Sequence, residues 1–273
     1  MSLKLPIQLQ VIIDKIQSYL NYESIGKRNT SFAQNGIGKV GTTAFLLGLI
    51  GGIHLGFLSL GLIIYYFIID TNQWNNIIIP ILQWCTYITF LSFFHFLEFF
   101  TTAYCQPSNV NYDSFVVNHS KDYTIAAIAS WIEFWIETLL FGKYKRSFFI
   151  MFIGYIMLLG GQIIRSIAMY SCGSNFSHTI MEERDEEHKL VTQGIYSILR
   201  HPSYFGWFYW SIGTQVFLCN PICTVLYTFA SWTFFSNRIP YEESLLLKFY
   251  KHQYDDYMKQ TIIGIPFISS RRK

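Results

Sequence analysis

The chain has 273 residues, of which 51% are hydrophobic, 19% are aromatic and only 14% are charged. Soluble domains carry about 25% charged residues, so this deficit indicates that much of the surface faces lipid. A net charge of +3 without a basic stripe argues against a nucleic-acid-binding protein. Five cysteines, mostly inside apolar runs, do not form a disulfide framework.

Residues 1–20 carry no pattern of a cleavable signal peptide, because Asp14 and Lys15 interrupt the apolar run. Apolar residues instead recur at helical spacing between Leu9 and Leu20. This spacing fits an amphipathic helix on the membrane surface, or an ordinary helix that leans on the rest of the protein. We assign residues 1–40 to a cytosolic N-terminal segment and residues 41–273 to one membrane-embedded domain.

Long apolar segments predict the membrane spans, because a helix needs about 20 apolar residues to cross the hydrocarbon core. Four such spans are predicted, at residues 41–69, 77–100, 123–141 and 147–164. A fifth apolar stretch, at residues 202–235, is interrupted by the turn signal Asn220-Pro221. We interpret it as a helical hairpin that supplies spans five and six.

The predicted fold class is therefore an all-α, polytopic membrane helical bundle of about six transmembrane helices with a C-terminal helical hairpin. An amphipathic helix should follow at Tyr241–Met258 and end before Gly264 and Pro266, with one shared face. That face holds Leu246, Phe249, Tyr250, Tyr254 and Tyr257.

Six crossings place both termini on one side, and the excess of lysine and arginine in these parts predicts that this side is cytosolic. One predicted loop disagrees, because Lys143, Lys145 and Arg146 would lie on the opposite side. The sequons at Asn29, Asn118 and Asn175 fall on the predicted cytosolic side, so we expect no glycosylation there.

Several polar residues, most of them ionisable, lie at predicted membrane depth, where they are costly and therefore candidates for function. Three pairs share helix faces, namely Glu133 with Glu137, His95 with Glu98, and Gln162 with Arg165. Each of these residues is a buried polar tie between helices, a group that snorkels to the membrane interface, or part of a polar cavity. Such a cavity would suit a transporter as well as an enzyme.

A second group of polar residues surrounds the start of the predicted hairpin. Pro202 and Ser203 fit the first turn of a helix, whose free N–H groups suit a polar or anionic ligand. His201, Tyr204 and Tyr196 crowd around that end, and Leu190 and Val191 could form a wall against a planar ring. The pattern predicts a small-molecule pocket at the water interface.

Arg238 is followed by Glu242 and Glu243 where the hairpin returns. An arginine fork can hold a carboxylate through two bonds, and a glutamate one turn later could orient it. The same residues also suit a solvated charge run at a helix start.

Five blocks resemble the isoprenylcysteine carboxyl methyltransferase family. They are residues 113–134, residues 173–178 (GSNFSH), residues 188–204, residues 206–223 and Arg238 with Glu242-Glu243. A shorter core, His201-Pro202 with Arg238 and Glu242-Glu243, is shared with phospholipid methyltransferases and some sterol reductases.

The resemblance implies an enzyme of the endoplasmic reticulum membrane that uses S-adenosylmethionine and needs no metal. It would methylate the C-terminal isoprenylcysteine carboxylate of prenylated, processed CaaX proteins of the small GTPase type, with its active site facing the cytosol. Arg238 would hold that carboxylate. The implied cofactor residues are His188, Lys189, Leu190, Val191, Tyr196, His201, Pro202, Ser203, Tyr204 and Glu242.

This chain departs from the family pattern at Met181, where some animal members carry a glutamine. It also lacks the extra N-terminal spans of the animal members. The alternatives are a related membrane lipid methyltransferase or a sterol-type reductase, and after these a transporter. The resemblance and the interfacial pocket place the methyltransferase first.

Overall fold

The computed structural model describes residues 37–68, 75–107, 110–117, 120–142, 145, 147–183 and 189–269. The predicted N-terminal amphipathic helix and the predicted cofactor residue His188 lie outside these residues. Helices make up most of the described chain, which contains one isolated β-bridge, between Leu199 and Ile262. The all-α fold class is therefore confirmed.

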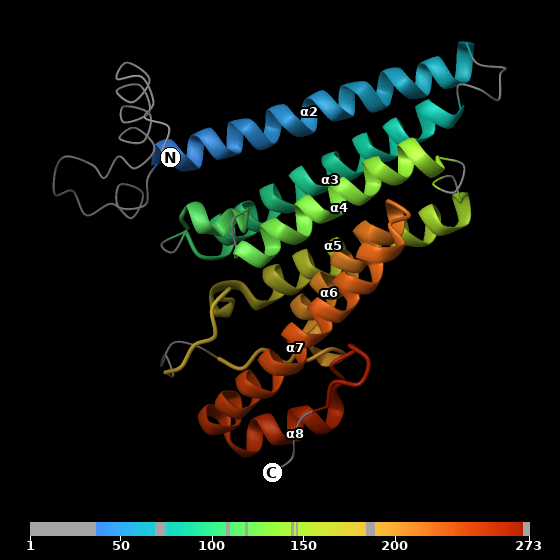
Figure 1. Ribbon diagram of the computed structural model, residues 1–273. Helices are drawn as coiled ribbons and strands as arrows, with labels where there is room; N and C mark the ends of the chain where they lie inside the picture. Colours follow the sequence, from blue (N-terminus) through green and yellow to red (C-terminus); the bar gives the residue numbers. More distant parts are fainter. Residues whose placement is uncertain are drawn as a thin grey trace, which may run out of the picture.

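Within the described residues, four helices are long and apolar enough to cross a bilayer, and their order follows the predicted spans. They are α2 (Ile37–Ile68), α3 (Asn75–Cys105), α4 (Lys121–Phe141) and α5 (Phe148–Cys172). Figure 1 shows α2 beside α3 at one edge of the molecule, with α8 at the opposite end. The chain is therefore an integral membrane protein.

The fourth predicted span ends too early. The charge of Arg165 suggested a boundary, but α5 continues for two more turns to Cys172. Arg165 is buried in the helix because Glu98 of α3 neutralises it, with Nε–Oε1 and Nη2–Oε2 distances of 2.5 and 2.6 Å. A paired charge does not have to leave the membrane interior.

The predicted hairpin region forms α6 (Pro202–Phe217) and α7 (Pro221–Tyr250), joined by residues 218–220. Neither helix is among the four apolar spans, so the assignment of spans five and six stays a prediction. The predicted separate helix at Tyr241–Met258 is wrong. Its first part continues α7, and Lys251 turns the backbone at φ 50° before α8 (His252–Gln260) begins.

The helices α5 and α6 pack closely because glycines face each other at their contact. A Cβ atom on Gly161 would lie 2.6 Å from the carbonyl oxygen of Gly206, and one on Gly206 would lie 2.8 Å from the backbone nitrogen of Arg165. Small residues allow such close approach between membrane helices. The contact fixes the start of α6 against Arg165.

Two charged side chains bind the end of α6 and the start of α7, where the two helices are joined. Glu133 of α4 accepts the backbone N–H groups of Ile222 and Cys223, both at 2.7 Å, and so caps the start of α7. Lys145 is buried, pairs with Glu137 at 2.7 Å and donates to the carbonyl oxygens of Leu218 and Cys219 at the end of α6. Each charge complements the helix dipole that it meets.

These contacts bear on two of the sequence-based expectations. Lys145 is enclosed and neutralised, so it does not count as a free loop charge in the positive-inside comparison, whereas Lys143 and Arg146 lie outside the described residues. Glu133 and Glu137 support the α6–α7 connection, which is the tie between helices that their spacing allowed.

Candidate functional site

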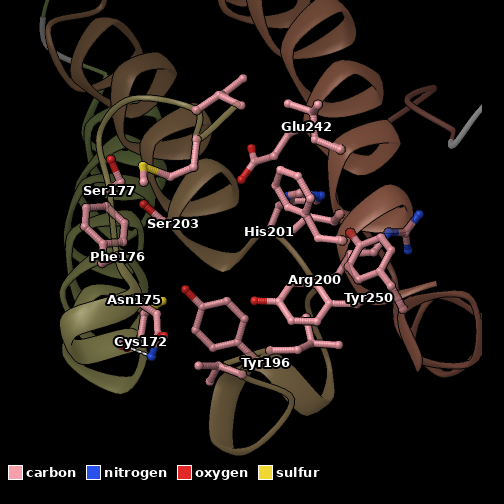
Figure 2. Close-up of a pocket in the computed structure, with 18 of the residues that line it drawn as sticks. Cys172, Asn175, Phe176, Ser177, Tyr196, Arg200, His201, Ser203, Glu242 and Tyr250 are labelled. Carbon is pink, nitrogen blue, oxygen red and sulfur yellow. Dashed lines mark hydrogen bonds between the residues drawn. The ribbon is translucent and has the colours of Figure 1, made fainter. Parts of the chain in front are cut away.

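A cavity opens between the segment that follows α5, the start of α6, the second half of α7 and α8 (Figure 2). Its empty volume, including the space at its mouth, is about 1050 Å³. Figure 2 shows Cys172, Asn175, Phe176 and Ser177 on one side, facing Glu242, His201 and Tyr250 on the other.

Nine of the predicted cofactor residues line this one cavity, although they come from two distant parts of the sequence. They are Lys189, Leu190, Val191, Tyr196, His201, Pro202, Ser203, Tyr204 and Glu242. Met181 also lines it. The structure therefore brings the predicted set together, and the role of each residue stays a prediction.

The first turn of α6 presents three of these residues. Pro202 occupies the start of the helix, where its missing N–H is not needed. Ser203 is buried, and its hydroxyl accepts a bond of 2.8 Å from Nη1 of Arg165. The His201 ring stacks on Tyr204, with parallel planes and centroids 5.4 Å apart.

Arg238 does not line the cavity but is joined to it by a short chain of hydrogen bonds. Its Nε donates to the Tyr204 hydroxyl at 2.9 Å, and that hydroxyl donates to Oε2 of Glu242 at 2.6 Å. Arg238 Nη2 donates to the carbonyl oxygen of His178 at 2.7 Å. Because Arg238 and Glu242 are four residues apart on α7, they share one face.

This chain of bonds combines two opposite chemical functions within one turn of helix. The guanidinium has five N–H donors, so the two contacts above leave donors for an anionic group. The Glu242 carboxylate faces the cavity and suits a cationic or hydroxyl-bearing group. A carboxylate bound by Arg238 would therefore lie close to a positively charged ligand bound at Glu242.

The other end of the cavity is formed by tyrosines and a second ion pair. Arg200 Nε donates to Oε1 of Glu243 at 2.5 Å, and Nε2 of His201 lies 3.2 Å from the same oxygen. The Tyr196 hydroxyl donates to the carbonyl oxygen of Ala168 at 3.3 Å, and the Tyr257 hydroxyl donates to that of Tyr196 at 2.7 Å. Burial raises the pKa of Tyr196, which keeps its hydroxyl a neutral donor.

Sequence reasoning did not assign Arg200, Asn175 or Tyr254 to the site. The partner of Arg200, Glu243, is distant in sequence, so no local spacing could indicate that pair. The sequence did contain a signal for Tyr254, because this residue belongs to the predicted apolar face of the C-terminal amphipathic helix. The predicted shared face of Leu246, Phe249, Tyr250, Tyr254 and Tyr257 lines the cavity in full, although these residues belong to two helices.

The polar residues predicted at membrane depth do not line this cavity. Glu98 and Arg165 came from two separate predicted pairs, and the structure pairs them with each other. His95 Nδ1 contacts the carbonyl oxygen of Phe115 at 2.9 Å, a tie between α3 and the 3-10 turn at Tyr112–Phe115. The described residues include no group of three or more His, Cys, Asp or Glu that could hold a metal ion.

Comparison with known proteins gives a consistent result. The profile of the family described as "Isoprenylcysteine carboxyl methyltransferase (ICMT) family" matches residues 135–248. A protein-S-isoprenylcysteine O-methyltransferase of Xenopus laevis is 51% identical over 67% of this chain and 63% of its own length. The protein of the same name from Saccharomyces cerevisiae is 35% identical over 86% of this chain and 93% of its own.

A solved structure is similar as well. It is that of a eukaryotic intramembrane Ras methyltransferase, an isoprenylcysteine carboxyl methyltransferase, with a TM-score of 0.72 and 40% identity over 96% of this chain and 85% of that one. The chain spans 63% and 65% of the lengths of the relatives from Xenopus laevis and Tribolium castaneum.

Proposed function

The chain belongs to the isoprenylcysteine carboxyl methyltransferase family, and from this premise we propose that it methylates the C-terminal isoprenylcysteine carboxylate of prenylated, processed CaaX proteins. The methyl donor is S-adenosylmethionine. One observation carries the proposal beyond the family name. The guanidinium of Arg238, a group that suits a carboxylate, is joined through the Tyr204 hydroxyl to Glu242 in the cavity wall.

The residues around the cavity fit this donor, which joins an aromatic base and a hydroxylated sugar to a cationic amino acid. Aromatic and apolar side chains line the end formed by α8, whereas Glu242 supplies negative charge at the other. Tyr254 is 1% exposed, and its hydroxyl has no hydrogen-bond partner among the described residues. A buried hydroxyl without a partner is costly, so it favours a ligand that bonds to it.

We assign cofactor binding to Lys189, Leu190, Val191, Tyr196, His201, Pro202, Ser203, Tyr204 and Glu242, with His188 as the preceding residue of the same segment. When bound, S-adenosylmethionine supplies an activated methyl group on a positively charged sulfur. Glu242 then balances that charge, and the Tyr204 bond holds Glu242 in place.

Arg238 prepares the acceptor. A free α-carboxyl group has a pKa of about 3.3–3.7, so it is ionised at neutral pH and requires no general base. Arg238 orients it, and the rings of Tyr204 and Phe234, with centroids 5.4 and 5.6 Å from the guanidinium carbon, keep water from that side. Orientation and removal of water are the two contributions that such a methyl transfer needs from the protein.

The proposed location is the endoplasmic reticulum membrane, with the active site and both termini facing the cytosol. The basic residues of the two terminal segments support this orientation. Treatment of the protein from eukaryotic cells with a glycosidase should leave its mass unchanged, because Asn29, Asn118 and Asn175 would never meet the lumenal glycosylation machinery. A glycan on any of the three would overturn the orientation.

One assay tests the proposed reaction. The purified protein is incubated with labelled S-adenosylmethionine and N-acetyl-farnesylcysteine, and a base-labile methyl ester is scored. Parallel reactions with a phospholipid acceptor, and with a sterol and NADPH, test the related activities. Absence of the ester from the first reaction would overturn the proposal.

The glutamates of α4 are expected to affect stability and not chemistry. Glu133→Gln weakens the cap of α7 and should cost about 1 kcal/mol of folding free energy. Glu137→Gln removes the carboxylate partner of buried Lys145. Both variants should show a lower Tm in detergent and retain methyl transfer, whereas Asp256→Asn, in an exposed ion pair, should keep the wild-type Tm. Lost transfer with normal Tm and cofactor binding would contradict this assignment.

A further inference from the structure

The turn at residues 173–178, which follows α5, is bonded to α3 and to the residue after it. Gln106 Nε2 donates to the carbonyl oxygen of Ser174 at 2.7 Å and also to that of Phe176. Two turns earlier on α3, Oε2 of Glu98 lies 3.0 Å from Nε2 of His178. The turn is therefore anchored by Glu98 within α3 and by Gln106, the residue that follows this helix.

The Glu98 anchor is itself fixed. Its carboxylate is 1% exposed and forms a two-bond pair with Arg165 of α5. Nη1 of Arg165 reaches further, to the hydroxyl of Ser203 at the start of α6. Because both partners are buried and bonded on several sides, His178 contacts a carboxylate that cannot move freely.

The same turn extends two contacts in the other direction, toward the site. The Asn175 side-chain oxygen accepts the backbone N–H of Lys189 at 2.8 Å, next to Leu190 and Val191 in the cavity wall. The His178 carbonyl oxygen accepts Nη2 of Arg238 at 2.7 Å. The Asn175 contact therefore reaches the proposed cofactor-binding segment, and the His178 contact reaches Arg238, the proposed carboxylate-binding residue.

We propose that Asn175 and His178 are positioning residues that set the two substrates relative to each other. Asn175 acts on the donor by holding the segment at Lys189. His178 acts on the acceptor, because its ring bond to Glu98 fixes the carbonyl group that orients Arg238. This inference rests on the proposed function and assigns one substrate to each residue. Methyl transfer needs such registration because a misplacement of 1 Å can cost about a hundredfold in rate.

The test is a kinetic comparison that a general loss of structure would not reproduce. Asn175→Ala should raise KM for S-adenosylmethionine by about tenfold or more and leave KM for N-acetyl-farnesylcysteine within about twofold. His178→Ala should raise KM for N-acetyl-farnesylcysteine by about tenfold or more and leave KM for S-adenosylmethionine within about twofold. Asn175→Asp keeps the acceptor oxygen and His178→Gln keeps a side-chain donor, so both should return toward wild-type values.

A matched control comes from the same turn. The Ser174 side chain is exposed, so Ser174→Ala should leave both KM values unchanged. If either alanine variant fails to fold, Asn175→Leu and His178→Phe replace it. They fill the space of the native side chains and lack the bonding atoms, and the Phe ring can still pack against Phe176.

The outcomes separate the two proposals. An active wild-type protein whose variants change both KM values together, or neither, would overturn the positioning roles and leave the proposed function intact. A wild-type protein that forms no ester would overturn the proposed function, and with it this inference.

Discussion

Arg238→Ala is expected to lower kcat/KM for N-acetyl-farnesylcysteine by about a thousandfold, equivalent to roughly 4 kcal/mol of transition-state stabilisation. The variant removes the cation that orients the acceptor carboxylate. Tyr204 keeps its bond of 2.6 Å to Glu242, so the wall of the cavity should remain in place. Binding of labelled S-adenosylmethionine should accordingly stay within a few-fold of wild type.

The control is Arg238→Lys. It keeps a positive charge but loses the planar guanidinium group, which donates to both the Tyr204 hydroxyl and the His178 carbonyl oxygen. We expect activity between those of the wild type and the alanine variant. Wild-type turnover in Arg238→Ala would show that another group holds the carboxylate. Loss of cofactor binding in the same variant would instead place Arg238 in the donor site.

The sequence predicted the long helices well because charged residues are costly in a membrane, so spanning helices appear as long segments with few or no charges. Each of the four apolar helices contains most of its predicted span. The same rule failed at Arg165, since a charge that is buried and paired does not mark a helix end. The partner, Glu98, lies 67 residues earlier, and no spacing rule connects residues so far apart.

The residues of the site were also predicted where the signal is local in the sequence and missed where it depends on contacts between distant segments. The residues in the contiguous block from Lys189 to Tyr204 were predicted together, because the block is local and resembles a family motif. The contacts that join this block to the rest of the protein were missed, namely Asn175 with Lys189, Arg200 with Glu243, and His178 with Glu98. They depend on how the helices and the segments between them pack, and only part of this packing, such as the close approach of Gly161 and Gly206 between α5 and α6, follows from residue size.

Breaking the Glu98–Arg165 pair is expected to have the largest effect on folding. Arg165→Met leaves the Glu98 carboxylate buried without its cation, which should cost about 3–5 kcal/mol. It also removes the donor to Ser203 at the start of α6. The double variant Glu98→Leu with Arg165→Met should recover most of this loss, because an apolar pair of similar volume requires no charge to be desolvated.

Thermal unfolding in detergent micelles of fixed composition measures the difference, with each single variant, the double variant and the wild type compared. Equal Tm values for Arg165→Met and wild type would contradict a buried, stabilising pair. The double variant carries a second expectation. It removes the carboxylate that holds His178, so a protein that folds should still show a raised KM for the prenylcysteine, because the orientation of Arg238 depends on that anchor. The double variant would then recover most of its stability but still bind the acceptor less well.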